Sequence, residues 1–163
     1  MNHRLRKALC FILVWAFVAG VIPQVTAQAA VNCKSLCGTV LKATGGSKQL
    51  KYASAAALDF GGLSSLDRKK VKSIQYVCDA KEAYSVCIIK TDNSSDAKSI
   101  LNSLKKYKKN NCSSNYLSDY TATEQKVFKN AMCGKKGTWV WYIAMSPKKG
   151  VNAKGQTALK KKL

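Results

Sequence analysis

The chain has 163 residues, with 28 lysines and arginines against 8 aspartates and glutamates, and its formal net charge at pH 7 is +20. This balance predicts attraction to polyanions, or else a basic surface that serves only solubility, and it does not indicate a fold. The one histidine is His3. The chain beyond it therefore lacks any serine–histidine or cysteine–histidine pair for nucleophilic catalysis and any histidine ligand for zinc.

The segment 1–30 has the three parts of a secretory signal peptide. Arg4, Arg6 and Lys7 form a positive start, an uncharged run covers residues 8–22, and the tract 25–30 has the small-x-small pattern that signal peptidase cleaves. We therefore expect a secreted or extracytoplasmic protein of the cell envelope. The alternative is an uncleaved N-terminal anchor, although the uncharged run is shorter than the roughly 20 apolar residues of a spanning helix.

Cleavage there leaves residues 31–163, with 25 basic and 8 acidic side chains and a formal charge of +17. A chain of that length suits a single basic domain with its own core.

Six cysteines lie in this domain, and an even number in an exported chain favours disulfides. Cys78 and Cys87 flank a predicted hairpin and would bridge across it. Cys33 and Cys37 are four positions apart on a predicted helix and would reach different partners. The alternative is a set of free thiols that pack as small apolar side chains. The six candidates are Cys33, Cys37, Cys78, Cys87, Cys112 and Cys133.

The N-terminal half of the domain predicts one helix and one hairpin. Apolar residues recur at helical spacing over residues 32–43, and the glycines at 45–46 end that helix. Residues 47–63 are ambiguous, because residues 53–57 favour a helix whereas the glycines at 61–62 mark a turn. The segments 73–78 and 84–90 are rich in β-branched and aromatic residues, so they predict an antiparallel hairpin.

The C-terminal half predicts three helices and a strand. The first helix follows residue 96 and ends among lysines, and the second opens with the capping box Thr121–Glu124 and extends to Met132. Segment 138–145 is apolar on both faces and predicts a central strand, and the last helix begins at Pro147. Together these elements predict an α+β fold, with a small antiparallel or mixed sheet of three to four strands and helices packed on it.

The order of several motifs resembles that of a known family. The motifs are a strand ending Ile88-Ile89-Lys90, a helix with spaced lysines, Tyr120-x3-Glu124-Gln125-x5-Ala131, and Gly137-x-Trp139-Val140 opening an aromatic strand. Over residues 58–163 the chain resembles the family catalogued as domain of unknown function 4358, small exported proteins of Gram-positive bacteria, many of them lipoproteins. The resemblance implies an envelope location and a compact α/β domain, but no activity and no site residues. The chain departs from many members in lacking a lipobox.

The sequence has none of the familiar motifs for catalysis, cofactor binding or metal binding. It contains no G-x-S-x-G, no glycine-rich phosphate loop and no Cys-x2-Cys. The acidic residues flank turns or suit helix caps and form no convincing carboxylate pair. Serines with lysines nearby, such as Ser73 and Ser103, follow from the abundance of lysine. We expect a protein that is not an enzyme and has no cofactor or metal. The alternative is a small extracytoplasmic hydrolase or transferase with a histidine-free site.

Two tryptophans lie on one face of the predicted central strand. Trp139 and Trp141 would form a stacking platform for sugars or bases, or they would pack in the core. The core interpretation is favoured because Val140 and Tyr142, on the opposite face, are also apolar.

Lysine clusters mark the candidate binding residues. Lysine acts as a flexible point charge, and the domain has one arginine, Arg68, so we expect electrostatic binding with little discrimination. The expected ligand is an anionic cell-wall polymer or an anionic membrane surface. A partner protein is a further option, and no specific nucleic-acid recognition is expected. Lys135 and Lys136 add to the charge. The candidate contacts are Lys105, Lys106, Lys108, Lys109, Lys148, Lys149, Lys160, Lys161 and Lys162.

Overall fold

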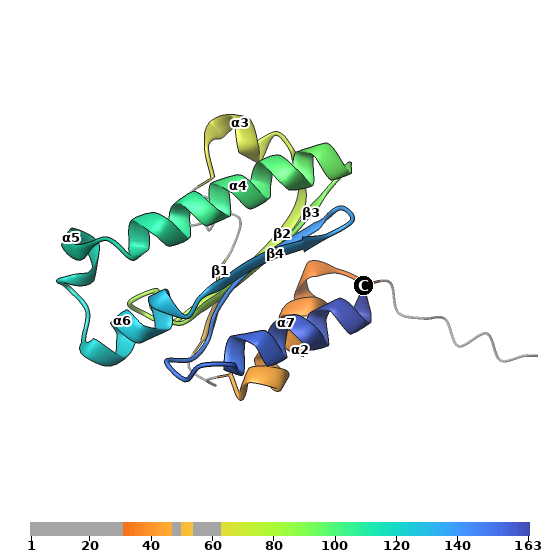
Figure 1. The fold of residues 1–163 in the computed structure, drawn as a ribbon. Helices are drawn as coiled ribbons and strands as arrows, with labels where there is room; N and C mark the ends of the chain where they lie inside the picture. The colour runs from red at the N-terminus through yellow and green to blue at the C-terminus, as the bar shows by residue number, and fades with distance from the viewer. Residues whose placement is uncertain (1–30, 47–49, 54–62) are drawn as a thin grey trace, which may run out of the picture. The chain divides into compact units, whose positions relative to one another are not determined.

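A five-stranded antiparallel sheet lies between two layers of helices in the computed structural model (Figure 1). The structure describes residues 31–46, 50–53 and 63–163, and the described residues from Val31 on belong to one compact unit. The predicted signal segment and its cleavage site lie outside the described residues, as does most of the segment 47–63. The predicted α+β class is confirmed.

The sheet has the strand order β1-β2-β3-β5-β4, and every neighbouring pair is antiparallel. The predicted hairpin forms its centre together with the predicted aromatic strand. A short edge strand, β1, comes from the segment whose structure the sequence left open, so the sheet has more strands than the three to four expected. The strands are β1 (Lys51–Ala53), β2 (Val71–Cys78), β3 (Ser85–Thr91), β4 (Met132–Lys136) and β5 (Trp139–Ala144).

The two central strands, β3 and β5, are buried along almost their whole length. Both are continuous apolar runs, as expected for strands covered by helices on both faces. On one face, the register places Tyr76, Cys87, Tyr142 and Cys133 in a single row across four strands. On the opposite face, Val86 belongs to a second apolar cluster. The sheet therefore separates two cores.

The helix α4 (Ser94–Asn111) covers the first face, together with α6 (Ala122–Lys129). The apolar side of α4 is buried at Ala97, Ile100 and Leu104. The predicted capping box of α6 is confirmed, because the Thr121 side chain accepts from the Glu124 backbone N–H and the Glu124 carboxylate accepts from that of Thr121. Two one-turn helices, α3 (Ser65–Arg68) and α5 (Ser114–Leu117), flank this layer.

The helices α2 (Cys33–Thr44) and α7 (Val151–Lys162) pack together on the second face (Figure 1). They approach closely at Gly155, where an added Cβ would lie 2.7 Å from Thr44 Cγ2. The predicted stop of α2 is confirmed, since Gly45 adopts φ 66°, a left-handed conformation that ends helices.

The prediction that the helix extends to Met132 is wrong. The helix α6 stops at Lys129, and residues 132–136 instead form β4, the second edge of the sheet. The short inter-strand turn at Gly137, with φ 57°, returns the chain directly into β5. The last helix also begins later than expected, at Val151 after Gly150, rather than at Pro147.

The expectation of disulfides is also corrected, because all six cysteines of the domain are free thiols in the structure. Cys87 pairs with Tyr76 rather than with Cys78, so the two cysteines are diagonal neighbours. Diagonal positions lie about 7–8 Å apart, whereas bridged cysteines need Cα atoms within about 4.4–6.8 Å. Cys33 and Cys37 pack on the opposite face of the sheet, with α2. The cysteines instead act as small apolar side chains.

We expect all six thiols to react with an alkylating reagent in denaturant without reductant. In the native protein, Cys33, Cys37 and Cys87 should stay unmodified because they are buried. Peptide mass mapping after each treatment measures this. Any of the six that stays unlabelled in denaturant until reductant is added would contradict the free-thiol state.

Candidate polyanion-binding face

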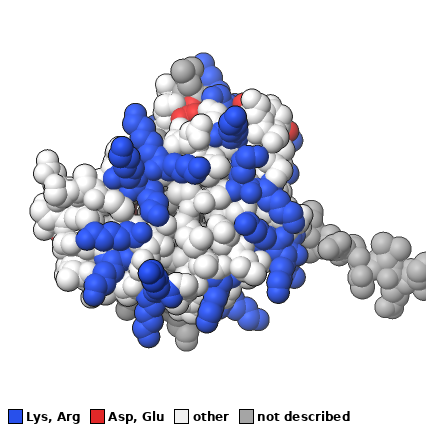
Figure 2. Space-filling view, in the orientation of Figure 1, with Lys and Arg blue, Asp and Glu red and all other residues white. Residues whose placement is uncertain are grey.

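The open edge of the sheet at β4 carries lysines from three elements. The strand β4 contacts α4 on one face and α7 on the other, so side chains of both helices flank the strand. Figure 2, in the orientation of Figure 1, shows many basic and few acidic side chains on the side that faces the viewer. We call five lysines of α4, β4 and α7 the β4-edge lysines: Lys105, Lys108, Lys135, Lys136 and Lys160.

Contacts within the protein hold three of these lysines at the edge. The Lys135 ammonium donates to Ser94 Oγ at the start of α4, at 3.5 Å. The Lys136 ammonium donates to the Lys160 carbonyl oxygen near the end of α7, at 3.0 Å. The Lys160 ammonium lies 5.9 Å from the centroid of the Trp141 ring. The hydrogen bonds therefore connect β4 to a helix on each side.

No acidic residue occurs in the two sequence stretches that supply the β4-edge lysines. Residues 97–118 contain five lysines and residues 125–163 contain ten, and neither stretch has an aspartate or glutamate. Asp96, in the first turn of α4, just precedes the first stretch and lies two positions after Ser94, to which Lys135 donates. The ion pairs found among the described residues involve Lys70, Lys72 and Lys81, so none of the β4-edge lysines is ion-paired with a described carboxylate.

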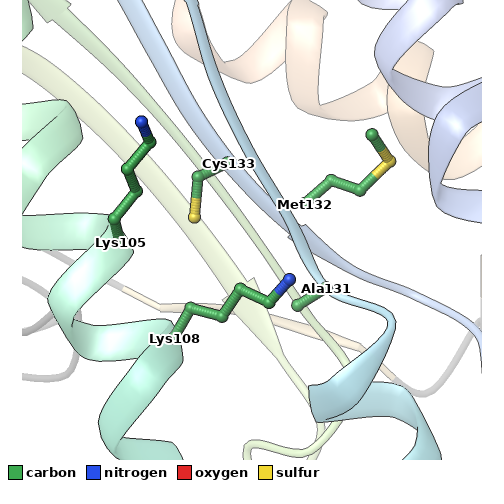
Figure 3. Close-up of a pocket in the computed structure, with 5 residues that line it drawn as sticks. All are labelled: Lys105, Lys108, Ala131, Met132 and Cys133. Atoms are coloured by element: carbon green, nitrogen blue, oxygen red, sulfur yellow. The ribbon is translucent and has the colours of Figure 1, made fainter.

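A pocket of about 270 Å³ lies at this edge, between α4 and β4 (Figure 3). Lys105 and Lys108 line it from the helix, and Ala131, Met132 and Cys133 line it from the strand side. Burial raises the pKa of the Cys133 thiol to about 11, against the opposing effect of the charges on Lys108 and Lys105. The thiol is therefore neutral at pH 7, and the pocket is lined by two ammonium groups and no anion.

The other predicted contacts lie around this edge without lining the pocket. Lys106 and Lys109 are exposed on α4 and do not line the pocket, although Lys109 is the i+4 neighbour of Lys105. Lys148 and Lys149 are exposed in the segment before α7. Next to them, the side-chain amide of Asn130 donates to the carbonyl oxygen of Pro147. The lysines at 161–162 are exposed in the last turn of α7. The lysines at 105–109 and at 160–162 lie toward the C-terminal ends of α4 and α7.

The strand-side wall of the pocket could not be predicted from the sequence. The sequence pattern predicts a helix through Ala131 and Met132 and a disulfide at Cys133, and neither prediction places these residues beside Lys105. The glycine at position 134 could have indicated a strand here, because a glycine within a strand often marks a place where another group approaches the backbone closely. Here the Trp141 ring crosses that glycine, and an added Cβ would lie 2.6 Å from the ring atom Cε2.

The two tryptophans do not form a platform. Trp141 is fully buried, and its Nε1 donates to Gln156 Oε1 at 3.0 Å. Trp139 is half-buried against the same core cluster, with the Lys90 ammonium 4.4 Å from its ring centroid. The core interpretation therefore applies to Trp141, and a cation covers the ring of Trp139.

The acidic residues mostly serve as structural hydrogen-bond acceptors. Asp79 accepts from the Tyr84 backbone N–H in the β2–β3 turn, where Glu82 adopts φ 58°. Burial raises the pKa of both carboxyls, and the charge of Asp79 adds to the shift at Glu82. Asp79 therefore stabilises the turn that joins the two strands.

A serine and a lysine also meet beside a carboxylate. The Lys70 ammonium donates to Ser99 Oγ at 2.7 Å, and Asp67 accepts from Ser99 and Ser103. Burial raises the pKa of Asp67, but hydrogen bonds from Ser103, Ser64 and Ser99 more than offset it, so the pKa lies below its usual value. The Lys70 ammonium also lies 3.7 Å from this carboxylate. The network connects α3 to α4.

The described residues contain no cluster of three or more side chains suited to hold a metal ion. Within the same residues, no helix has both the length and the apolar content needed to cross a bilayer.

Comparison with known proteins gives one match. A family model described as Domain of unknown function (DUF4358) matches residues 59–145, a stretch that contains β4, β5 and the pocket but neither α2 nor α7. No curated protein and no solved structure matches the chain. Because the match covers more than half of the sequence and includes the motifs that suggested the resemblance, the chain belongs to the family of domain of unknown function 4358.

Proposed function

We propose that this protein is an exported, non-catalytic protein of the cell envelope that binds anionic envelope polymers or anionic membrane surfaces through the β4-edge lysines. The observation that carries the proposal is the convergence of lysines from α4, β4 and α7 on one edge, in sequence stretches without a single acidic residue. Export is supported by the signal-like segment 1–30.

Two physical arguments support binding over a mere role in solubility. A solubility surface works best with charges of both signs interspersed, whereas the two sequence stretches that supply these lysines carry one sign only. Like charges held close together repel, and a polyanion relieves that repulsion while it releases its own counterions. Because the domain has one arginine, Arg68 in α3, the contacts are point-charge contacts that do not read a particular polymer.

The test is binding to immobilised poly(glycerol phosphate) and to phosphatidylglycerol vesicles over a salt series. With about five phosphate contacts, one for each β4-edge lysine, the affinity should fall by about 100–500-fold between about 50 and 200 mM salt. Neutral vesicles are the control and should bind nothing. Elution from both anionic ligands below physiological salt, about 150 mM, would contradict the proposal and leave the charge as a solubility feature.

A further inference from the structure

We propose that the pocket between α4 and β4 binds one phosphate group, held between the ammonium groups of Lys105 and Lys108. The inference rests on the proposed function, because the phosphate would be one unit of the anionic polymer or the headgroup of an anionic lipid. The pocket would then be one defined phosphate-binding subsite within the broader basic face.

The geometry brings both lysines to the same wall. Lys105 and Lys108 are three positions apart on α4, so their side chains leave the same side of the helix. In Figure 3 the Lys108 side chain extends from α4 toward Ala131, whereas the Lys105 side chain runs alongside Cys133 and its ammonium group points away from that of Lys108. The thiol donates to the Leu104 carbonyl oxygen at 3.5 Å, which ties the strand wall to the helix wall. The pocket therefore has two sides that are fixed relative to each other.

The wall opposite the lysines strengthens their field. Ala131, Met132 and the neutral Cys133 thiol present apolar or weakly polar surface. A cleft with charges of one sign and low-dielectric walls concentrates the electrostatic potential, so an anion is bound more strongly there than on a flat, solvated surface. The exposed neighbours Lys106 and Lys109 are not among the residues that line this pocket.

The size and donor set favour a phosphate group. Pockets for drug-sized ligands have volumes of about 300–1,000 Å³, so a pocket of about 270 Å³ fits a smaller group such as glycerol phosphate. Lysine binds phosphate as a compact point charge with several N–H donors. Two ammonium groups can each donate to a different phosphate oxygen, while the rest of a polymer or lipid extends into solvent along β4.

The experiment is a titration of the ¹⁵N-labelled protein with glycerol phosphate, followed through the backbone amide resonances. Saturable shifts should be concentrated at residues 131–133. The Lys105→Gln/Lys108→Gln variant should weaken glycerol phosphate binding about tenfold or more, because hydrogen bonds between charged groups are lost. The Lys106→Gln/Lys109→Gln variant removes the same charge from the same helix and should weaken binding less than about threefold at moderate salt, since neither side chain lines the pocket and solvent screens its charge.

The outcomes separate the subsite from the broader function. Equal weakening by the two variants, or no saturable shift at residues 131–133, would overturn the subsite even if the polymer still binds. Loss of all binding to polymer and vesicles would instead overturn the proposed function. Competition identifies the source of the phosphate: displacement of glycerol phosphate by poly(glycerol phosphate) indicates the wall polymer, and displacement by phosphatidylglycerol vesicles indicates the lipid. If neither displaces it, the pocket is not part of the binding face and the inference is wrong.

Discussion

Replacing all five β4-edge lysines by glutamine should lower the affinity for phosphatidylglycerol vesicles by more than about a thousandfold. Each lysine near an anionic surface contributes roughly 1 kcal/mol at physiological salt, and each 1.4 kcal/mol corresponds to a factor of about ten. The salt dependence should weaken as well, because each lost phosphate contact removes about 0.7–0.9 from the slope of log affinity against log salt. Equilibrium binding to vesicles at several salt concentrations measures both quantities.

A matched variant separates position from total charge. It replaces five exposed lysines that are not among the candidate contacts by glutamine: Lys42, Lys69, Lys126, Lys129 and Lys154. Both variants have the same net charge, so a purely global attraction predicts the same loss in both. We expect the matched variant to retain most of the affinity, because its lysines are dispersed over α2, the end of α3, α6 and α7. Equal losses would show that no particular face is used.

Local sequence signals were sufficient for the central part of the fold. The β3 and β5 segments are apolar on both faces, and strands with that pattern occupy the middle of a covered sheet, as they do here. The start of α6 was predictable because its capping box joins Thr121 to Glu124, which are close in the chain. In each case the determining interactions are local or repeat along a single element.

The edge of the sheet could not be predicted in the same way. Residues 132–136 include a glycine and two lysines, which have weak strand propensity. They form a strand because they pair with β5 and because the Trp141 ring crosses Gly134. Tertiary contacts decide such segments, and the helical pattern of the preceding residues, taken alone, predicts a helix that is too long.

The candidate face depends on the same tertiary arrangement. Lys105, Lys136 and Lys160 lie far apart in the sequence, and only the antiparallel sheet with a helix on each side brings them to one edge. The sequence did indicate each cluster separately. The sequence alone could not decide between disulfides and free thiols. Which cysteines come close together depends on the register of β2 against β3 and on which face of the sheet α2 covers.

The Trp141→Ala variant should lose about 3–5 kcal/mol of unfolding free energy, the usual cost of truncating a large buried aromatic side chain. Trp141 is fully buried between the sheet and the α2–α7 layer, and its indole N–H is satisfied by Gln156. Truncation leaves a cavity above Gly134, which has no side chain to fill it, and an unpaired amide oxygen on α7. Because domains of this size are stable by only about 5–15 kcal/mol, the midpoint of urea unfolding should fall sharply.

Trp139→Ala is the matched control for that loss. Trp139 is on the same strand and packs on the same cluster, but it is half-buried and its principal polar contact is the cation of Lys90. An exposed cation–π contact is worth about 0.5–1 kcal/mol, so this truncation should cost clearly less than the other. Similar losses in the two variants, measured by circular dichroism in urea, would mean that Trp141 does not support the β4 edge. A large loss at Trp141 alone means that the sheet that carries the β4-edge lysines is stabilised by a buried side chain outside the proposed binding face.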